Sequence, residues 1–375
     1  MAADTPSTSP SSNRSHFAHL QTPHSGYHWT GSSDRFFEGW YTRLTLPACK
    51  DSFAFMYSIE DPIGGQPHSG GCAQVLGPND AYFCRTLPNV QQFWAWPNAL
   101  GVGHWRKHRS PAPKPQFLQG DRFFTHVHEG YQLTATHHQG QLYNPRANEW
   151  IRWQYTIQPI YGWGSTNQAQ QSTAGWLSQF PIFEPGWQIL MAHGYATGWI
   201  DWLGKCYEFV DAPVYSEKNW GSSFPGKWFW IQCNSFESQP DLTLTAVGSL
   251  RHLLGLQETV GMVGVHHQQQ FYEFVPWNAQ IRWTVHPWGI WKMTADNGQY
   301  VVTLNGIAPP HSATTVRVPS ENGMVFNCRD TTHGELTLQL YQKQANQLHL
   351  ICEAHSQAAG LETGGEPWHE IWERA

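Results

Sequence analysis

The segment at residues 215–220 combines residue types that could carry out acid–base chemistry. It reads Tyr-Ser-Glu-Lys-Asn-Trp. Successive side chains of a β-strand point to opposite faces, so Tyr215, Glu217 and Asn219 would share one face. A carboxyl group in an apolar pocket stays protonated, because desolvation raises its pKa, and it can then act as a general acid. Glu217 is therefore a candidate acid.

A second alternating segment follows at residues 227–234, Lys-Trp-Phe-Trp-Ile-Gln-Cys-Asn. Its side chains Trp228, Trp230, Gln232 and Asn234 would also share a face. On a strand next to 215–220, they would complete one polar and aromatic cavity, and indole faces can stabilise a cation. The alternative is that Glu217 pairs with a neighbouring Lys or Arg on the solvent face. Because charged residues are mostly exposed, the pattern alone favours that alternative.

A further carboxyl, Glu38, lies in the segment Phe-Phe-Glu-Gly-Trp-Tyr-Thr-Arg at residues 36–43. In a strand, Glu38, Trp40 and Thr42 would share a face. A glycine between Glu38 and Trp40 allows another backbone or a ligand to approach closely. The other interpretation is a structural Glu hydrogen-bonded inside a strand junction, since a buried carboxylate needs partners. The pattern does not distinguish these two.

Metal, phosphate and serine-hydrolase chemistry have no motif in the sequence. The 21 His include His24 and His28, but none forms a helix-borne HExxH motif or a Cys-His zinc spacing. The 7 Cys contain no CxxC pair, which argues against a structural zinc module and a disulfide framework. No glycine-rich phosphate loop and no GxSxG elbow occur. We therefore do not expect a metal site.

The elements that must position these residues are short strands. Segments of six to eight residues, rich in aromatic and β-branched types, are bounded by Gly, Pro, Asn or Asp, as in 53–59, 186–193, 227–234, 280–285 and 335–341. Many such strands at short spacing predict an all-β fold of antiparallel sheets that close as barrels or sandwiches, with few short helices. We expect irregular structure at 106–120, 164–174 and 356–366.

The length of 375 residues suits two β domains. We predict a tail at 1–22, an N-terminal domain at 23–222 and a C-terminal domain at 223–375. Charged residues make up only 13% and the formal net charge is −6, which argues against a nucleic-acid partner. No stretch approaches the length of a membrane-spanning helix. The N-terminus has no apolar core of a secretory signal, so we do not expect secretion.

The quoted segments, taken together and in order, closely resemble the tocopherol cyclase family of plant plastids and cyanobacteria. The resemblance covers roughly residues 23–370. Besides residues 36–41, 215–221 and 227–234, it rests on the following segments: Pro-His-Ser-Gly-Tyr-His-Trp at 23–29, Ser-Phe-Ala-Phe-Met-Tyr-Ser-Ile-Glu at 52–60, Pro-Ile-Tyr-Gly-Trp-Gly at 159–164, Ser-Thr-Ala-Gly-Trp at 172–176, Tyr-Glu-Phe-Val-Pro-Trp-Asn at 272–278, Pro-Trp-Gly at 287–289 and Cys-Arg-Asp at 328–330.

The resemblance implies a cofactor-free cyclisation of a prenylated benzoquinol, 2-methyl-6-phytyl-1,4-benzoquinol or its dimethyl form, to a chromanol. An acid protonates the prenyl double bond, and the phenol oxygen captures the tertiary carbocation. A more distant similarity, to carotenoid hydratases and lipocalin-like Diels–Alderases, implies two lipocalin-like barrels packed side by side. It also implies that the acid lies near Glu217, with Glu38 as the second candidate. The distant group has a carboxylate where this chain has Asn219, so the proton acceptor stays open.

With the resemblance included, we expect Glu217 to be the general acid and Glu38 a second carboxyl that accepts a proton or orients the first. Tyr215 and Asn219 would position the quinol oxygens. The expected aromatic wall consists of Trp40, Trp220, Trp228 and Trp230, and Gln232 and Asn234 complete the substrate-binding set.

The resemblance also bears on location. A lipid-soluble substrate implies peripheral contact with a thylakoid membrane or lipid droplet. The short leader is more similar to a cyanobacterial member, in the cytoplasm or at the thylakoid, than to a plant protein of the plastoglobule.

Two other functions stay open on the sequence. A non-catalytic, lipocalin-like carrier of prenylquinols would need the same apolar pocket but no acid. A carbohydrate-binding β-sandwich would need exposed Trp platforms, and it ranks last because the aromatic residues lie on the predicted strands.

Overall fold

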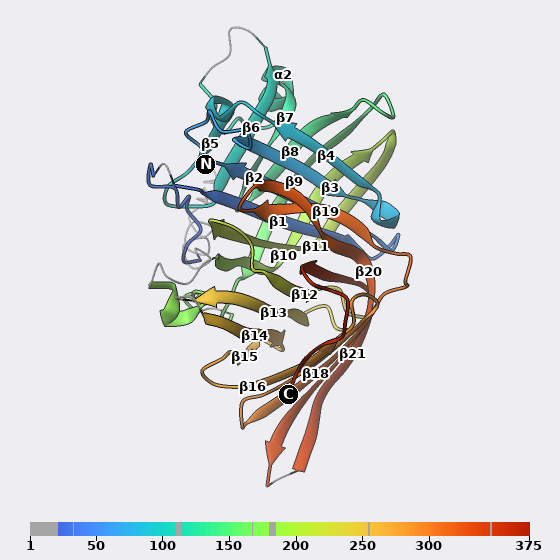
Figure 1. The fold of residues 1–375 in the computed structure, drawn as a ribbon. Coiled ribbons are helices and arrows are strands. Elements are labelled where there is room, and N and C mark those ends of the chain that lie inside the picture. The colour runs from blue at the N-terminus through green and yellow to red at the C-terminus, as the bar shows by residue number, and fades with distance from the viewer. Residues whose placement is uncertain are drawn as a thin grey trace, which may run out of the picture.

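A computed structural model describes residues 22–375, except for 33, 110–113, 167, 180–184, 254–255 and 346. The predicted tail therefore lies, apart from residue 22, outside the described residues. Residues 37–221 form one antiparallel sheet, sheet A (Figure 1). Its strands are β1 (Phe37–Leu46), β2 (Asp51–Glu60), β3 (Gly70–Leu76), β4 (Tyr82–Leu87), β5 (Phe93–Ala95), β6 (Gly101–His108), β7 (Val127–Thr134), β8 (His137–Asn144), β9 (Glu149–Tyr161), β10 (Gly186–Trp202) and β11 (Lys205–Gly221).

The order of sheet A is β4-β3-β2-β1-β11-β10-β9-β8-β7-β6-β5. The last strand in the chain, β11, therefore returns to the first, β1, in the middle of the sheet. Glu217 of β11 lies directly opposite Tyr41 of β1 in this pairing.

Residues 227–374 form sheet B, which is also antiparallel and has the order β15-β14-β13-β12-β21-β20-β18-β17-β16-β22, with β19 paired to β20. Its strands are β12 (Lys227–Cys233), β13 (Thr243–Leu253), β14 (Leu256–His267), β15 (Gln270–Phe274), β16 (Gln280–Val285), β17 (Ile290–Asp296), β18 (Tyr300–Ile307), β19 (Thr314–Ser320), β20 (Gly323–Gln344), β21 (Gln347–Gly365) and β22 (Trp372–Arg374). The helical elements are short: α2 (Asp121–His126) and the 3-10 turns η2 (Pro78–Asp80), η3 (Val90–Gln92) and η4 (Gly175–Gln179).

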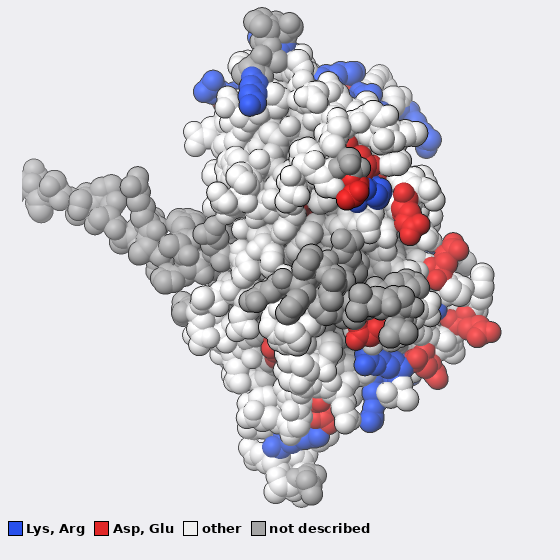
Figure 2. Space-filling view, turned by 60° about the vertical axis from the view of Figure 1, so that its left-hand side comes forward, with Lys and Arg blue, Asp and Glu red and all other residues white. Residues whose placement is uncertain are grey.

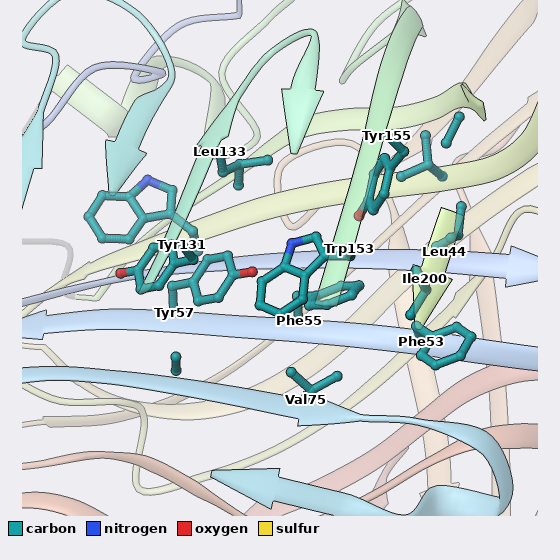
Figure 3. Packing of buried hydrophobic residues seen from close by; sticks show 14 of the residues in the cluster. Leu44, Phe53, Phe55, Tyr57, Val75, Tyr131, Leu133, Trp153, Tyr155 and Ile200 are labelled. Atoms are coloured by element: carbon teal, nitrogen blue, oxygen red, sulfur yellow. The ribbon is translucent and has the colours of Figure 1, made fainter. Parts of the chain in front are cut away.

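Each sheet curls around its own core, because strand alternation turns every second side chain inward. In sheet A, Phe55 of β2 packs against Trp153 of β9, with ring centroids 4.9 Å apart, and Tyr57 stacks on Tyr131 of β7 at 3.7 Å (Figure 3). Sheet B encloses a separate core in which Phe229 packs edge-on against Trp283. Burial of these large apolar surfaces, worth about 25 cal/mol per Å², stabilises both sheets.

A fully buried arginine joins the two sheets. Arg43 of β1 donates from Nη1 to Oε1 of Gln232 on β12, 2.9 Å away. Its Nη2 donates to the carbonyl oxygens of Thr332 (3.1 Å) and Ala358 (2.5 Å). A buried guanidinium is tolerated only where acceptors surround it, so these contacts fix sheet B against β1.

The hairpin of β19 and β20 makes a second connection, since it reaches from sheet B over sheet A (Figure 1). Asp80 of η2 accepts hydrogen bonds from the hydroxyl of Thr331 (2.5 Å) and the backbone N–H of Thr332 (2.9 Å). Gln74 of β3 donates to the carbonyl of Arg317 on β19 at 2.9 Å. These polar contacts hold β19 and β20 against sheet A.

The low charged fraction is visible at the surface. In the view of Figure 2, Lys, Arg, Asp and Glu gather at the top, at the bottom and along one edge, and most of the other described surface carries neither sign. In the described part of the chain, no helix is both long and apolar enough to cross a membrane.

The predicted all-β, lipocalin-like architecture, with two antiparallel sheets side by side and few short helices, is confirmed. Sheet A ends at Gly221 and sheet B begins at Lys227, so the predicted seam near residue 222 falls between the sheets. That residues 23–222 and 223–375 are independent domains stays a prediction.

Two predicted irregular segments need correction. Residues 356–366 are not irregular, because all but the last belong to β21, in which Gly360 and Gly364 lie beside large indole rings. At 106–120, residues 106–108 continue β6, and the described residues beyond them, 109 and 114–120, lie outside helices and strands.

Candidate active site between the two sheets

Glu217 lies in the interface between the sheets, with only 8% of its surface exposed. The hydroxyl of Tyr215 donates a hydrogen bond to Oε2 of Glu217 at 2.6 Å. The indole N–H of Trp230, from β12, donates to the same oxygen at 3.2 Å. The solvent-facing ion pair that the pattern favoured is therefore wrong, and the predicted grouping of Tyr215 with Glu217 on one face is confirmed.

Burial raises the pKa of Glu217 above its ordinary value. Hydrogen bonding from Tyr215, Trp187, Trp230 and Asn219 opposes this rise, because each of these groups stabilises the carboxylate. The carboxyl is thus held toward its neutral form, while donors for the anion already surround it.

Two neighbouring indoles on β12 hold two different carboxyl groups. Trp230 donates to Glu217, and Trp228 donates to Oε1 of Glu362 on β21. Burial, together with the charge of Glu217, raises the pKa of Glu362 to about 7, against the hydrogen bond from Trp228. Glu362 therefore titrates close to neutral pH.

A third buried carboxyl, Asp330 of β20, lies directly opposite Glu362 in the pairing of β20 with β21. Neither of its carboxyl oxygens has a hydrogen-bond partner among the described residues. Burial, followed by the charge of Glu362, raises the pKa of Asp330 well above its ordinary value, although Arg43 opposes the shift. Asp330 is therefore held toward its neutral form.

A cavity of about 510 Å³ opens beside Glu217 and Glu362. Such a volume lies in the usual range for small-molecule sites, roughly 300–1,000 Å³. Sheet A contributes β10 and β11 to its wall, and sheet B contributes β12, β13, β14 and β21. Its aromatic and apolar lining is formed by Phe36, Leu177, Trp187, Trp220, Phe224, Trp228, Trp230, Val247, Val260 and Met262.

A smaller cavity of about 80 Å³ continues past the two carboxyls toward β19. It shares Glu217, Asn219, Phe224 and Glu362 with the larger cavity. Both carboxyls therefore lie at the junction of a large apolar space and a small one, and Asn219 lies with them.

Glu38, the second predicted carboxyl, lies on the opposite face of sheet A. It is fully buried and forms an ion pair with Lys218, the residue next to Glu217 in β11. The backbone N–H of His28 donates to Oε2 of Glu38 at 2.9 Å. Adjacent residues of a strand point to opposite faces, so the structure does not bring Glu38 and Glu217 together. A catalytic role for Glu38 stays a prediction.

Of the predicted aromatic wall, Trp228, Trp230 and Trp220 line the large cavity. Trp220 stacks on the imidazole of His28, with ring centroids 3.9 Å apart and an interplanar angle of 3°. Trp40 packs in the core of sheet A, and Lys218 Nζ lies 5.8 Å from its ring centroid.

Gln232 and Asn234 lie farther along β12 than the two indoles. Gln232 accepts the hydrogen bond from Arg43 that joins the sheets. Asn234 is buried, and its amide N and O have no hydrogen-bond partner in the described part of the chain. That Gln232 and Asn234 contact the substrate stays a prediction.

Sequence reasoning missed Glu362, Asp330 and Trp187. Glu362 was not identified because the Gly- and Ala-rich sequence around it suggested irregular structure. One signal was available: Gly360, Glu362 and Gly364 alternate in sequence. A Cβ on Gly360 would lie 2.7 Å from the Trp230 ring, and one on Gly364 would lie 2.0 Å from the Trp228 ring. These glycines leave room for the indoles that flank the carboxyl.

A hollow of about 590 Å³ also lies over β16, β17, β18 and β22. It is lined by Arg282, Lys292 and Arg374 together with polar and apolar residues, and no acidic side chain belongs to its lining. It is therefore less suited to acid chemistry. Among the described residues, no group of three or more His, Cys, Asp or Glu side chains could hold a metal ion.

Comparison with known proteins gives concordant results. A family model described as tocopherol cyclase-like matches residues 34–365. The maize protein "Tocopherol cyclase, chloroplastic" is 41% identical over 379 residues, covering 94% of this chain and 80% of its own length. The rice protein "Probable tocopherol cyclase, chloroplastic" is 40% identical with the same coverage. Among solved structures, kievitone hydratase from Nectria haematococca is similar, with a TM-score of 0.46, 9% identity, and coverage of 88% of this chain and 89% of that one.

Proposed function

The chain belongs to the tocopherol cyclase family, a family of enzymes, and on that premise we propose that it closes the chromanol ring of tocopherols. The substrate is 2-methyl-6-phytyl-1,4-benzoquinol or its dimethyl form. The reaction is an isomerisation, in which every atom of the quinol is kept in the chromanol. It needs no electron donor or acceptor, so we propose that it uses no cofactor.

The first step is protonation of the prenyl double bond by Glu217. Both of the hydrogen bonds from Tyr215 and Trp230 fall on Oε2, so we assign the acidic proton to Oε1. As the proton leaves, the two donors strengthen their hold on the growing carboxylate, which stabilises the transition state more than the ground state. Tyr215 thus acts through Glu217, and Asn219 at the junction of the two cavities positions a quinol oxygen.

In the second step, the tertiary carbocation must persist until the phenol oxygen captures it. The faces of Trp230, Trp228 and Trp220 supply electron density at the cavity wall, and a desolvated cation over an indole gains about 2 kcal/mol. The same apolar wall excludes water, which would otherwise trap the cation as an alcohol. Attack by the phenol oxygen then closes the ring.

The observation that carries this proposal is a buried carboxyl with a raised pKa in an aromatic cavity. The test is an anaerobic incubation of the purified protein with the reduced quinol in D₂O, followed by mass spectrometry. We expect a chromanol that carries one deuterium beside the ring-closing carbon. Glu217→Gln is expected to lower kcat by about 10²- to 10⁴-fold, the range for a general acid. Glu208→Gln, an exposed change on the same strand, is the matched control and should keep full activity.

The competing carrier function has a separate outcome in the same experiment. Substrate that stays bound to wild-type protein and unchanged would contradict the cyclase proposal and support a prenylquinol carrier. Wild-type turnover by Glu217→Gln would leave the activity intact but remove Glu217 from the role of the acid.

We also propose that the protein contacts a lipid surface, at a thylakoid membrane or a lipid droplet, where a phytyl quinol resides. Turn η4 contributes Leu177 to the cavity and carries Trp176, which is 59% exposed, and Trp277 beside the turn is 42% exposed. Indole rings favour the boundary between lipid and water. Flotation with vesicles should fall for Trp277→Ser, but it should not fall for Trp96→Ser, which changes a 39% exposed indole elsewhere on the chain.

A further inference from the structure

We propose that Glu362 is the second catalytic carboxyl, which takes the phenol proton at ring closure while Glu217 supplies the proton to the alkene. This inference rests on the proposed cyclisation and deepens it. The bonds balance as follows. The O–H bond of Glu217 breaks and a C–H bond forms on the prenyl chain. The phenol oxygen then forms the C–O bond, and its O–H bond breaks as Glu362 gains the proton.

The position of Glu362 supports this role. It lines both cavities together with Glu217 and Asn219, so a quinol that reaches Glu217 also reaches Glu362. The two carboxyls are held by indoles two residues apart on β12, Trp230 for Glu217 and Trp228 for Glu362. Their spacing is thus built into one short strand.

The hydrogen bonds divide the roles between the two carboxyls. Tyr215, Trp230, Trp187 and Asn219 all stabilise the carboxylate of Glu217, whereas an indole N–H and a thiol favour the ionised form of Glu362. The carboxyl with more donors gives up its proton more readily, and the carboxyl with fewer donors holds a proton more tightly. Transfer from Glu217 to the alkene and from the phenol to Glu362 is therefore favoured in that direction.

The groups around Glu362 bring its pKa close to neutral pH, so it can gain and lose a proton there. From β20, Cys328 and Asp330 face it, and Asp330 lies directly across the ladder. Burial keeps the pKa of Asp330 well above its ordinary value and that of the Cys328 thiol well above its own. The Cys328 thiol is therefore neutral at pH 7 and Asp330 is held toward its neutral form, whereas the pKa of Glu362 is raised to about 7. Arg317 also lines the small cavity.

A pair that works in this way is active only when it holds one proton. Below the lower pKa of the pair both carboxyls are protonated and no base is present. Above the upper pKa both are ionised and no acid is present. The wild-type rate should therefore follow a bell-shaped pH profile.

The test is the pH profile of Glu362→Gln in the full-length protein, with 2-methyl-6-phytyl-1,4-benzoquinol as the substrate. We expect kcat to fall about 100-fold and the low-pH limb to disappear, because no base remains to be protonated. Binding of the saturated phytanyl analogue, which cannot be protonated, should change by less than about 3-fold. Glu353→Gln, an exposed change on the same strand, should keep the wild-type profile.

The outcomes separate this inference from the proposed function. A Glu362→Gln variant with normal kcat, or with a lowered kcat and an unchanged bell, would overturn the role of Glu362 even if Glu217→Gln is inactive. Activity retained by Glu217→Gln would instead overturn the proposed acid. If Glu362→Gln does not fold, the pH profile of Glu362→Asp provides the test. A shifted low-pH limb supports the proposal, and a limb at the wild-type position contradicts it.

Discussion

The phenol of Tyr215 donates a 2.6 Å hydrogen bond to Oε2 of Glu217, two residues farther along the same strand. This hydrogen bond joins two buried side chains and stabilises the carboxylate more than the neutral acid. It therefore lowers the pKa of a group that burial alone would raise further.

We expect Tyr215→Phe to raise the pKa of Glu217 and to lower kcat by about 10-fold, because a hydrogen bond to a charged group is worth about 1.5–3 kcal/mol. The measurement is kcat as a function of pH. The high-pH limb of this profile, where Glu217 loses its proton, should move to higher pH. Tyr41→Phe is the control, since the hydroxyl of Tyr41 is buried without a hydrogen-bond partner among the described residues. An equal shift in both variants would contradict the specific role of Tyr215.

The second prediction concerns the indole that touches the acid. Trp230→Phe keeps an aromatic face but removes the N–H donor to Glu217 and weakens the hold on a carbocation. Because a desolvated cation–π contact contributes up to about 2 kcal/mol, we expect kcat to fall about 30-fold with a smaller change in KM. A change in KM alone would indicate that Trp230 only binds substrate.

The fold class followed from the sequence because strand alternation and turn residues are local signals. Tyr215, Glu217 and Asn219 were grouped by the same period of two, and the two indoles of β12 were grouped in the same way. What could not be predicted depends on pairing between distant strands. The sequence does not state that β21 lies beside β12, and so Glu362 could not be assigned to the indole of Trp228.

Glu38 illustrates the opposite case. Its alternation with Trp40 and Thr42 was predicted, but the face on which the three lie depends on the pairing of β1 with β11. That pairing puts Lys218 beside Glu38 and puts Glu217 on the other side of the sheet. Burial of the lysine lowers its pKa, and the charge of Glu38 opposes that change. No local pattern specifies this partner.

A third prediction concerns a pair of thiols away from the carboxyls. Cys72 and Cys84 lie on β3 and β4 with their Sγ atoms 3.3 Å apart, and Arg317 Nη1 lies 3.8 Å from Cys84 Sγ. The hydrogen bond from Cys72, helped by Tyr82 and Arg317, lowers the pKa of Cys84 to about 6 despite burial.

Cys84 should therefore be mostly thiolate at pH 7 and should react with iodoacetamide faster than Cys206. Cys206 is exposed, but partial desolvation of its thiol, followed by the charges of Glu208 and Asp201, raises its pKa. The reaction rate at Cys84 should fall as the pH is lowered through 6. Peptide mapping by mass spectrometry measures both rates. Faster labelling of Cys206 at pH 7 would contradict the assignment, and Arg317→Met should slow labelling of Cys84 by raising its pKa.

The last prediction tests how the carboxyl of Glu362 is held. A Cβ on Gly364 would lie 2.0 Å from the ring of Trp228, so Gly364→Ala must displace the indole that donates to Glu362. Overpacking of this kind costs about 1–3 kcal/mol, and we expect urea denaturation to show a loss of that size. The displaced indole should also raise the pKa of Glu362, because the donor to its carboxylate is lost.

Gly298→Ala has open space around the new methyl group and a φ of +86°, so it reports the cost of backbone strain alone. If Gly364→Ala loses stability without any change in the pH profile, Trp228 packs in the interface but does not tune Glu362.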